Sequence, residues 1–384
     1  MRHTARIDKL LYYIAFSIYI FFSACSHSRI VDIGGVERII QLGRYFAVAL
    51  MLCKFFMNRR IKISIFLAWI IGIVITSTVF VYMDSTLPLI LILVVLSSRD
   101  CEGKILAKIY LWATGIVVIG STVLSQIGII QDKVYIRRAT GAVRHALGMQ
   151  YVTVWAAFVY FLICAYIYYR EEIRVVEAVI ILLLDMYLYA MTDARLEAGM
   201  IILAMIICMI YKSGKLDNKV VRFFLRYSML ISCSISFLVQ YLYMMNPVRY
   251  QQLDNVLSKR LSLTAGVINE QGFHLFGKNF FMQGFGTKDF DWSLGYNYVD
   301  SFYINYTLRY GIILMLFLCI LFSVVCNKLC DNGNDWLLIF FAFGAMHGFV
   351  ISSIFLPQCN PFFVIAFAEY TNIRKNGNIL KGVG

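Results

Sequence analysis

Charged residues are scarce in this sequence, and their scarcity argues against a soluble protein. Asp, Glu, Lys and Arg make up 15% of its 384 residues, whereas soluble domains average about 25%. The chain also has no internal repeat, no low-complexity tract and no segment with the composition of a soluble domain. Its formal net charge is +13, but no RNA-binding motif or basic helix accompanies that charge, so we expect no nucleic-acid partner.

Residues that hold metals or phosphates in familiar motifs are missing as well. Most of the ten cysteines lie inside apolar stretches, where thiols behave as small hydrophobic side chains. Cys326 and Cys330 flank a short loop, but no second pair or histidine cluster completes a metal site. Residues 284–288 resemble a phosphate-binding loop only superficially, because the required spacing is absent. We therefore expect neither a metal nor another cofactor.

Long apolar stretches dominate what is present. Hydrophobic residues form 60% of the chain, and a bilayer core of about 30 Å is crossed by about 20 apolar helical residues. In lipid, the backbone must satisfy its own hydrogen bonds, which favours helices. The sequence thus predicts an all-α polytopic membrane protein with a single transmembrane domain over residues 1–384. About 12 transmembrane helices are expected, at residues 10–25, 39–57, 63–83, 86–97, 105–129, 148–169, 174–191, 197–211, 223–245, 301–326, 336–355 and 361–370.

Basic residues between the apolar stretches predict the topology. The first apolar run ends at Cys25 and follows basic residues, as in a signal peptide, but the many later spans favour a first transmembrane helix. With the N-terminus inside, most lysines and arginines fall on cytoplasmic segments, among them residues 54–62, as the positive-inside bias requires. We expect a multi-pass protein of the inner (cytoplasmic) cell membrane with both termini cytoplasmic.

Two outer segments contain basic residues that topology does not explain. The first, residues 130–148, holds three arginines and a histidine: Arg137, Arg138, Arg144 and His145. A helix is expected to begin near Gly148. Arginine grips phosphate through permanently charged, paired donors, and the amides of a helix N-terminus add to an anion site. The alternative is a solvated loop that touches lipid headgroups.

The second outer segment is a large extracytoplasmic loop, residues 246–300, before the tenth span. Its candidate site residues are Arg260, His274, Lys278 and Asp300. Residues 273–306, including Tyr303, are dense in aromatic side chains, whose planes stack on the apolar faces of sugars. The alternative is an aromatic belt at the membrane interface. Histidine near neutral pH accepts a proton from a hydroxyl, so His145 and His274 are candidate bases.

Charged residues also lie within predicted spans, where they are costly unless they face the bundle interior. They are Arg44, Asp185 and Arg309, with Asp193 and Arg195 at the outer end of the eighth span. One interpretation is a buried Asp–Arg pair that holds helices together. The other is a cavity that opens outward and binds a charged lipid headgroup.

Short motifs flank the first outer segment. Arg137 and Gly148 have ten residues between them, and residues 144–149 read Arg-His-Ala-Leu-Gly-Met. Residues 192–195, at the start of the eighth span, read Thr-Asp-Ala-Arg. They resemble the patterns Arg-x10-Gly, Arg…Leu-Gly-Phe and Thr-x-Ser-Arg of the Wzy-type polysaccharide polymerases, which share a membrane superfamily with the O-antigen ligases.

The large loop adds further motifs of the same family. Residues 257–261 (Leu-Ser-Lys-Arg-Leu) and 275–277 (Leu-Phe-Gly) resemble its Leu-Ser-Gly-Arg…Leu-Phe-Gly run. Residues 300–303 (Asp-Ser-Phe-Tyr) and 310–312 (Tyr-Gly-Ile) are similar to its Asp-Asn-x-Tyr…Gly-Ile-Ile segment. The resemblance covers residues 130–330.

Several positions depart from the family. Residues 151–153 are Tyr-Val-Thr where the family often has His-Pro-Asn. Ala194 replaces a serine and Ser301 an asparagine. After Arg260, the nearest matching glycine is Gly272, one residue beyond the Arg-x10-Gly spacing. No histidine therefore transfers from the family as the catalytic base.

The resemblance implies a metal-independent glycosyltransferase of capsule or O-antigen polysaccharide biosynthesis. It would move a growing glycan from an undecaprenyl diphosphate carrier to a lipid-linked repeat unit on the outer face of the membrane. A diphosphate leaving group needs fixed cations. The expected catalytic residues are Arg137, Arg144, His145, Arg260, His274 and Asp300. The expected substrate-binding residues are Arg138, Arg195, Arg309, Tyr303 and Lys278.

Two other functions share these features. An O-antigen or polysaccharide ligase uses nearly the same chemistry on a different acceptor. A flippase for lipid-linked oligosaccharide also has about twelve spans with both termini inside, although transporter sites usually lie near the midplane and come with internal repeats. In every case the expected partners are an undecaprenyl diphosphate-linked oligosaccharide and membrane lipid. A chain-length regulator and a flippase are candidate protein partners of a polymerase.

Overall fold

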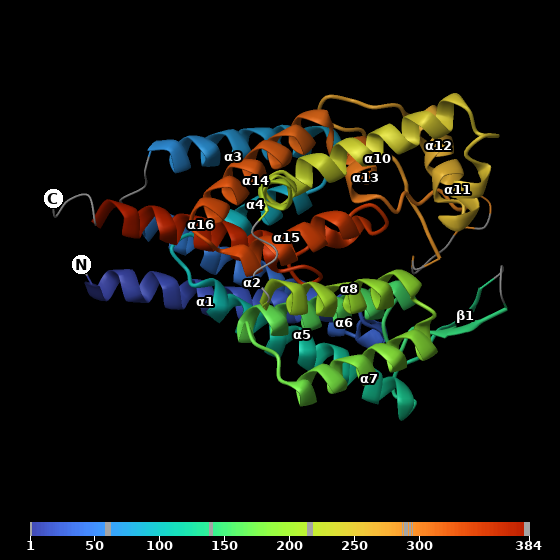
Figure 1. Cartoon of the computed structure of the whole chain (residues 1–384), viewed down its shortest axis with the longest axis horizontal. Coiled ribbons are helices and arrows are strands. Elements are labelled where there is room, and N and C mark those ends of the chain that lie inside the picture. Colours follow the sequence, from blue (N-terminus) through green and yellow to red (C-terminus); the bar gives the residue numbers. More distant parts are fainter. Residues whose placement is uncertain are drawn as a thin grey trace. The chain divides into compact units, whose positions relative to one another are not determined.

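The protein is almost entirely helical in the computed structural model (Figure 1). The structure describes residues 2–57, 63–137, 141–212, 218–285, 287, 291, 293 and 295–379. Helices account for 74% of the chain, and the only sheet in the described part has two short strands. This confirms the predicted all-α polytopic membrane fold.

Two compact units make up the chain. Unit 1 comprises residues 1–58, 97–222 and 357–384, and unit 2 comprises residues 59–96 and 223–356. Each unit is assembled from segments that are distant in sequence. The expectation of a single transmembrane domain stays a prediction.

Unit 1 is built around α6 (Val152–Arg170), which is buried on all sides. A helix that is apolar all round belongs in the interior of a bundle. Its neighbours are α5, α7 and α8, while α1 packs against α2 and α5, and α16 packs against α5. The bounds of these elements are α1 (Arg2–Cys25), η1 (Arg29–Asp32), α2 (Val36–Met57), α5 (Gly103–Gln126), α7 (Val175–Thr192), α8 (Arg195–Lys212) and α16 (Phe362–Ile379).

In unit 2, α10 (Ser228–Met245) is the central element. It packs against α12, α13, α14 and α15, while α14 also contacts α3. The large loop supplies two short helices, α11 (Gln251–Val256) and α12 (Arg260–Gln271). The remaining elements are α3 (Ile63–Met83), α4 (Leu87–Ser97), α13 (Phe302–Tyr310), α14 (Ile312–Asp331), α15 (Asp335–His347) and η2 (Ser352–Phe355). A short helix, α9 (Lys219–Arg226), runs across the boundary between the units in the sequence.

Each of the twelve predicted spans overlaps a helix. Within the described residues, eight helices are long and apolar enough to cross a bilayer: α1, α2, α3, α5, α6, α7, α10 and α14. Three further apolar helices are shorter, at Leu87–Ser97, Asp335–His347 and Phe362–Ile373. The protein is therefore embedded in a membrane.

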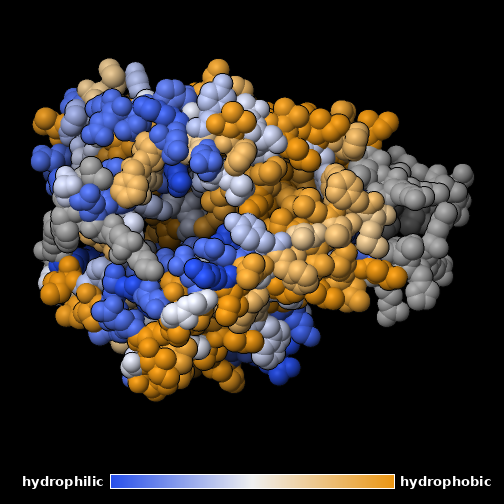
Figure 2. All heavy atoms as spheres, turned by 180° about the vertical axis from the view of Figure 1, so that it is seen from behind, coloured by the Kyte–Doolittle hydropathy of each residue, from blue (hydrophilic) through white to orange (hydrophobic). Residues whose placement is uncertain are grey.

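Large apolar side chains lie on the outside of the helices. On α5, Trp112, Ile116 and Ile119 follow one face of the helix and are 66%, 57% and 67% exposed. Figure 2 shows that hydrophobic side chains cover a broad part of the face in view. Contiguous apolar surface of this kind marks contact with lipid or with another protein.

The predicted span at residues 301–326 is two helices rather than one. Gly311 separates α13 from α14 and has a φ of +93°, which other residues rarely adopt. Beyond it, the N–H of Ile312 donates to the carbonyl of His274 at 3.0 Å, and the N–H of Ile313 donates to the carbonyl of Leu275 at 3.1 Å. The first amides of a helix lack partners within it, and here the large loop supplies their acceptors.

Gly277 faces Gly311 across this contact. Gly277 has a φ of +85°. A Cβ atom at Gly277 would overlap the carbonyl oxygen of Arg309, and one at Gly311 would overlap that of Leu275. Only glycine therefore fits at either position. The Leu-Phe-Gly and Tyr-Gly-Ile motifs are thus explained by backbone packing between the loop and the broken helix.

Candidate functional site: an arginine cluster and two loop networks

The first outer segment folds into a β-hairpin in unit 1. β1 (Val134–Ile136; Figure 1) pairs antiparallel with β2 (Val143–His145). In this register Tyr135 lies opposite Arg144. Successive residues of a strand point to opposite faces. The side chains of Arg144 and His145 therefore lie on different faces of the hairpin.

Gly148 fixes the base of this hairpin. Its carbonyl accepts the N–H of Arg29 at 2.8 Å and the hydroxyl of Ser28 at 3.1 Å. Gly148 has a φ of +77°, and a Cβ atom there would overlap the carbonyl oxygen of Ser121. This left-handed backbone cannot start a helix, so α6 begins only at Val152, four residues after the predicted start. The glycine of the Arg-x10-Gly motif is thus structural.

Arginines of the hairpin attach it to the end of α7. Arg137 Nε lies 2.9 Å from Asp193 Oδ2, and Arg137 Nη2 donates to the Asp193 carbonyl at 2.9 Å. Arg144 Nε donates to the carbonyl of Thr192 at 2.7 Å. From α8, Arg195 Nε reaches Asp193 Oδ1 at 3.2 Å. The carbonyl end of a helix carries partial negative charge, so the three arginines gather there. We call them the arginine cluster.

The arginine cluster keeps an excess of positive charge. Arg137 and Arg195 pair with one carboxylate, that of the buried Asp193, whereas Arg144 is bonded to a backbone carbonyl. Within the described residues, the Nη atoms of Arg144 and Arg195 make no hydrogen bond, and the side chain of Arg195 is 56% exposed. Burial, and next the charge of Arg144, lower the pKa of Arg137. An anion with several oxygens would offset this repulsion. Arg138, also predicted to bind substrate, lies outside the described residues.

His145 has a partner that the sequence did not suggest. Its Nδ1 atom lies 2.7 Å from Asp132 Oδ2, and Asp132 Oδ1 accepts the N–H of Leu147 at 2.7 Å. The side chains of His145 and Asp132 are 34% and 25% exposed. The sequence does not indicate that Asp132 contacts His145, because the contact depends on the hairpin that brings residues 132 and 145 together.

In unit 2, Arg260 binds Asp300. Arg260 is the first residue of α12, and its Nε atom donates to Asp300 Oδ2 at 2.8 Å. The preceding Lys259 has a φ of +66°, where the family pattern has glycine. The backbone at this position thus needs the left-handed conformation that glycine adopts most easily. The buried Asp254 accepts the N–H groups of Leu261 and Ser262, so the first amides of α12 already have a carboxylate partner.

Asp300 lies in a polar network at the end of the large loop. Burial raises the pKa of Asp300, and the charge of Arg260 opposes that increase. The charges of Asp300 and Arg309 both act on the phenol of Tyr298. Arg309 has a buried Nε atom without a hydrogen-bond partner among the described residues, and its guanidinium lies 5.3 Å from the ring centroid of Tyr310. The ion pair observed in this network is that of Arg260 and Asp300.

Three other predicted site residues of unit 2 lie apart from this network. Tyr303 is fully buried, and its hydroxyl donates to the carbonyl of Ala345 at 2.7 Å. This placement supports packing rather than substrate contact. His274 is exposed, with Nε2 3.0 Å from the carbonyl of Gln271, and Lys278 is exposed.

The charged residues within spans do not form the predicted intramembrane Asp–Arg pair. Asp185 lies on the buried face of α7, and no arginine pairs with it among the described residues. Arg44 lies next to the phenol of Tyr19. The Asp–Arg contact that does form is between Asp193 and Arg137, beyond the end of α7.

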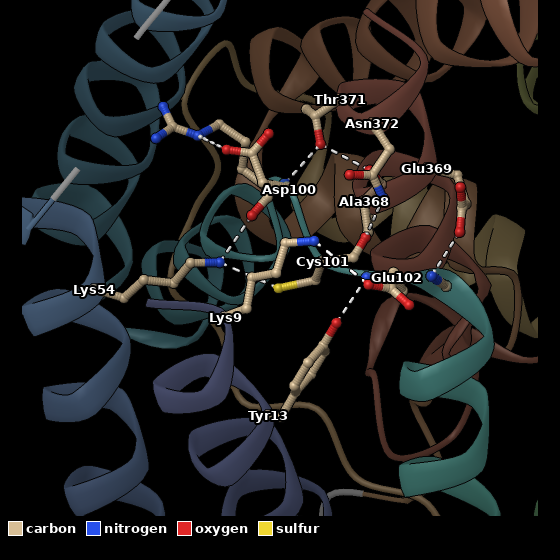
Figure 3. Close-up of polar contacts among 12 residues, drawn as sticks. Lys9, Tyr13, Lys54, Asp100, Cys101, Glu102, Ala368, Glu369, Thr371 and Asn372 are labelled. Carbon is tan, nitrogen blue, oxygen red and sulfur yellow. Dashed lines mark hydrogen bonds and ion pairs between the residues drawn. The ribbon is translucent and has the colours of Figure 1, made fainter. Parts of the chain in front are cut away.

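A second polar cluster of unit 1 surrounds residues 98–102, the loop before α5 (Figure 3). Lys54 is 3% exposed and donates to the carbonyls of Ser97 and Arg99 at 2.6 and 2.8 Å. Its Nζ atom also lies 3.2 Å from Cys101 Sγ and 4.6 Å from the ring centroid of Tyr12. The ammonium group is thus held inside the unit.

Residues of α1 and α16 hold the same loop. Tyr13 accepts the N–H of Glu102 at 2.9 Å through its hydroxyl. On α16, Glu369 accepts the N–H of Gly103 at 2.6 Å, and Asn372 donates to the carbonyl of Cys101 at 2.6 Å (Figure 3). Most of the contacts described above are made to the backbone of one loop, which indicates a structural role.

No described His, Cys, Asp or Glu residues form a group of three that could hold a metal ion. The expectation of no metal or other cofactor stays a prediction. No protein-family model, curated protein or solved structure matches the chain significantly. The function must therefore be inferred from the residues themselves.

Proposed function

We propose that this protein is a polysaccharide polymerase of the cytoplasmic membrane. It is a metal-independent glycosyltransferase that moves a growing glycan from undecaprenyl diphosphate onto a lipid-linked repeat unit at the outer face. The observation that supports the proposal most is the arginine cluster. Arg137 and Arg195 pair with the carboxylate of Asp193, and Arg144 donates to the neighbouring carbonyl of Thr192. The sequence predicts these residues on the outer side of the membrane, where the positive-inside bias disfavours basic residues.

The chemistry of the reaction fits such a cluster. When the bond between the anomeric carbon and the diphosphate breaks, negative charge develops on the leaving oxygens. Fixed donors that are already oriented stabilise that charge without reorganisation. Arg137 is oriented by its two contacts with Asp193, and the Nη groups of Arg144 and Arg195 remain for an anion.

A second support comes from how the family-like motifs pair within each unit. In unit 1, the motif at 137–148 contacts the motif at 192–195 through Arg137 and Asp193. In unit 2, Arg260 of the motif at 257–261 binds Asp300 of the motif at 300–303. Motifs that are far apart in sequence therefore meet as two charged networks, which is expected when each network serves one function.

The proposal is tested by extending a lipid-linked repeat unit with purified protein. We expect the wild type to form long chains, and Arg144→Ala to reduce the extension rate at least tenfold at equal protein amount. Arg38→Ala is the matched control, because Arg38 is an exposed arginine of unit 1 outside the cluster. A parallel pair in unit 2 is Arg260→Ala with the exposed Arg249→Ala. Full extension by both Arg144→Ala and Arg260→Ala contradicts the proposal.

Deletion of the gene separates the proposal from its alternatives. Loss of a polymerase leaves single repeat units on the final acceptor and lipid-linked repeats on the outer leaflet. Loss of a ligase leaves full-length lipid-linked polymer without surface attachment. Loss of a flippase leaves lipid-linked repeats on the inner leaflet. The position of the arginine cluster beyond the end of α7, rather than at mid-span, favours the first two functions over the third.

A further inference from the structure

The pair of Asp132 and His145 has the geometry of an oriented base. The carboxylate of Asp132 divides its two oxygens between His145 Nδ1 and the N–H of Leu147, both at 2.7 Å. A carboxylate that accepts from Nδ1 keeps the proton on that nitrogen and leaves the lone pair on Nε2. Within the described residues, Nε2 of His145 makes no hydrogen bond, and the side chain is 34% exposed.

The scaffold below this pair is firmly held. The N–H of Ala146, next to His145, donates to the carbonyl of Lys133 at 2.9 Å. Gln150 is bound twice to the segment before η1, through its N–H to His27 and its side-chain amide to Ser26. A base placed on a rigid element acts at a defined position.

The other candidate bases are less suited to accept a proton. His274 directs Nε2 at the carbonyl of Gln271, and no carboxylate contacts its ring among the described residues. Asp300 is occupied by the guanidinium of Arg260. Among His145, His274 and Asp300, only His145 combines an orienting acid with a ring nitrogen that makes no hydrogen bond to a described residue.

We propose that Asp132 is a positioning residue that makes His145 the general base of the reaction, an inference that rests on the proposed polymerase function. His145 Nε2 takes the proton of the acceptor sugar hydroxyl as that oxygen bonds to the anomeric carbon of the donor. The bond from this carbon to the diphosphate oxygen breaks, and undecaprenyl diphosphate leaves with the electron pair. The imidazolium, stabilised by Asp132, then releases its proton to water.

The opposite faces of the hairpin suit the two separate tasks of binding the diphosphate and accepting the proton. Arg144 and His145 are neighbours on β2 and point to different faces. In a direct displacement, the attacking hydroxyl and the leaving diphosphate stand on opposite sides of the anomeric carbon. The cations that receive the diphosphate and the base that receives the proton must therefore be separated. The hairpin therefore carries both an arginine that binds the diphosphate and the histidine that accepts the proton.

The variant Asp132→Asn tests the orientation without removing the hydrogen bonds. The N–H of Leu147 requires an acceptor, so the amide oxygen of the asparagine takes that place. Its NH2 group then faces His145 Nδ1, which must become the acceptor and move the ring proton to Nε2. The base is lost while the hairpin is kept. We expect kcat to fall about tenfold or more with KM for the lipid-linked repeat unchanged.

Further variants show whether Asp132 acts through His145. We expect His145→Ala to lower kcat by roughly 100-fold or more, and added imidazole to restore part of that loss. The double variant should be no slower than His145→Ala alone, because residues that act as a unit are not additive. Asp32→Asn is the control, since Asp32 pairs with Arg29 in the same unit. An unchanged kcat in Asp132→Asn, or multiplied losses in the double variant, overturns the inference.

A chemical measurement tests the pair even without turnover. Diethyl pyrocarbonate modifies an unprotonated, accessible imidazole nitrogen, and mass spectrometry locates the product. We expect His145 to react in the wild type and several-fold more slowly in Asp132→Asn, while the buried His347 serves as the internal unreactive control. Equal rates, or an unreactive His145 in the wild type, overturn the inference. An inactive wild type with the expected labelling would instead count against the proposed polymerase function.

Discussion

Arg137 and Asp193 are joined through two different groups of the aspartate. Arg137 Nε lies 2.9 Å from the carboxylate, and Nη2 donates to the backbone carbonyl at 2.9 Å. Asp193 itself has a φ of +45° and ends α7. One guanidinium therefore contacts both the side chain and the backbone carbonyl of the residue that ends α7. The contact ties the hairpin to α7 and, in the same step, orients the arginine for an anion.

This double contact requires arginine. A lysine carries the same charge on a single nitrogen without the planar pair of donors. We expect Arg137→Lys to lower chain extension at least tenfold and to speed hydrogen exchange of the Val143–His145 strand. Arg38→Lys, at an exposed position, should match the wild type in both measurements. An Arg137→Lys variant with normal extension and exchange would show that charge alone suffices.

The facing glycines of unit 2 should tolerate no side chain. We expect Gly277→Ala and Gly311→Ala each to lower the free energy of unfolding by more than about 2 kcal/mol, because the added Cβ meets a carbonyl oxygen at a positive φ. The control is Gly266→Ala in α12, where a Cβ meets open space; alanine there should stabilise by about 0.5–1 kcal/mol. Thermal unfolding in detergent measures all three, and a stable Gly311→Ala protein would contradict the described break.

Lys54 should be essential for the stability of unit 1. Lys54→Met keeps the length of the side chain but leaves the carbonyls of Ser97 and Arg99 without their donor. We expect a loss of about 2–4 kcal/mol, because buried acceptors that lose a charged partner are costly. Cys53→Ser is the neighbouring control at an exposed site. Equal melting temperatures of the two variants would mean that the ammonium contributes little.

The network of Asp300 should make stability depend on pH. Burial raises the folded-state pKa of Asp300 above its ordinary value, so the folded chain binds more protons than the unfolded chain between the two values. The contribution of this group to stability is therefore lost as pH rises through that window. In Arg260→Ala the opposing cation is gone, so the loss of stability should be larger at pH 7.5 than at pH 4.5. Equal losses at both values would exclude the coupling.

Lys259 stands in a backbone conformation that favours glycine. Its φ is +66°, and its ammonium lies 3.8 Å from the carboxylate of Asp254 at a half-exposed position. We expect Lys259→Gly to raise the free energy of unfolding by about 1 kcal/mol. Lys278→Gly is the control, because Lys278 is exposed and has no positive φ. A decrease in the melting temperature of Lys259→Gly would contradict this account.

Apolar length was enough to predict the helices, because a membrane-spanning helix leaves a hydrophobic run about 20 residues long. It was not enough for the break at Gly311, since one glycine scarcely changes the hydropathy of residues 301–326. The hairpin also escaped prediction. Its strands, Val134–Ile136 and Val143–His145, are three residues long, too short to show an alternating pattern.

The sequence predicts the cationic residues of the candidate site, but it does not predict the groups that these residues contact. Arg137 and Arg144 are indicated by their place in a predicted outer segment, and Arg195 by its place at the end of a predicted span. Their contacts with the end of α7 arise from tertiary structure, which brings residues 56 and 48 positions apart together. For the same reason the sequence does not indicate that Lys54 is buried and bonded to the carbonyls of Ser97 and Arg99.

The contact between the large loop and the broken helix has a consequence for how the protein is made. α14 follows the loop in the chain, yet its amides at Ile312 and Ile313 bond to carbonyls at His274 and Leu275. The first turn of α14 therefore gains these two acceptors only once the loop has folded back onto it. A chimera that exchanges this loop without residues 274–277 would leave the N–H groups of Ile312 and Ile313 without these acceptors. Formation of this helix turn and folding of the loop are thus coupled.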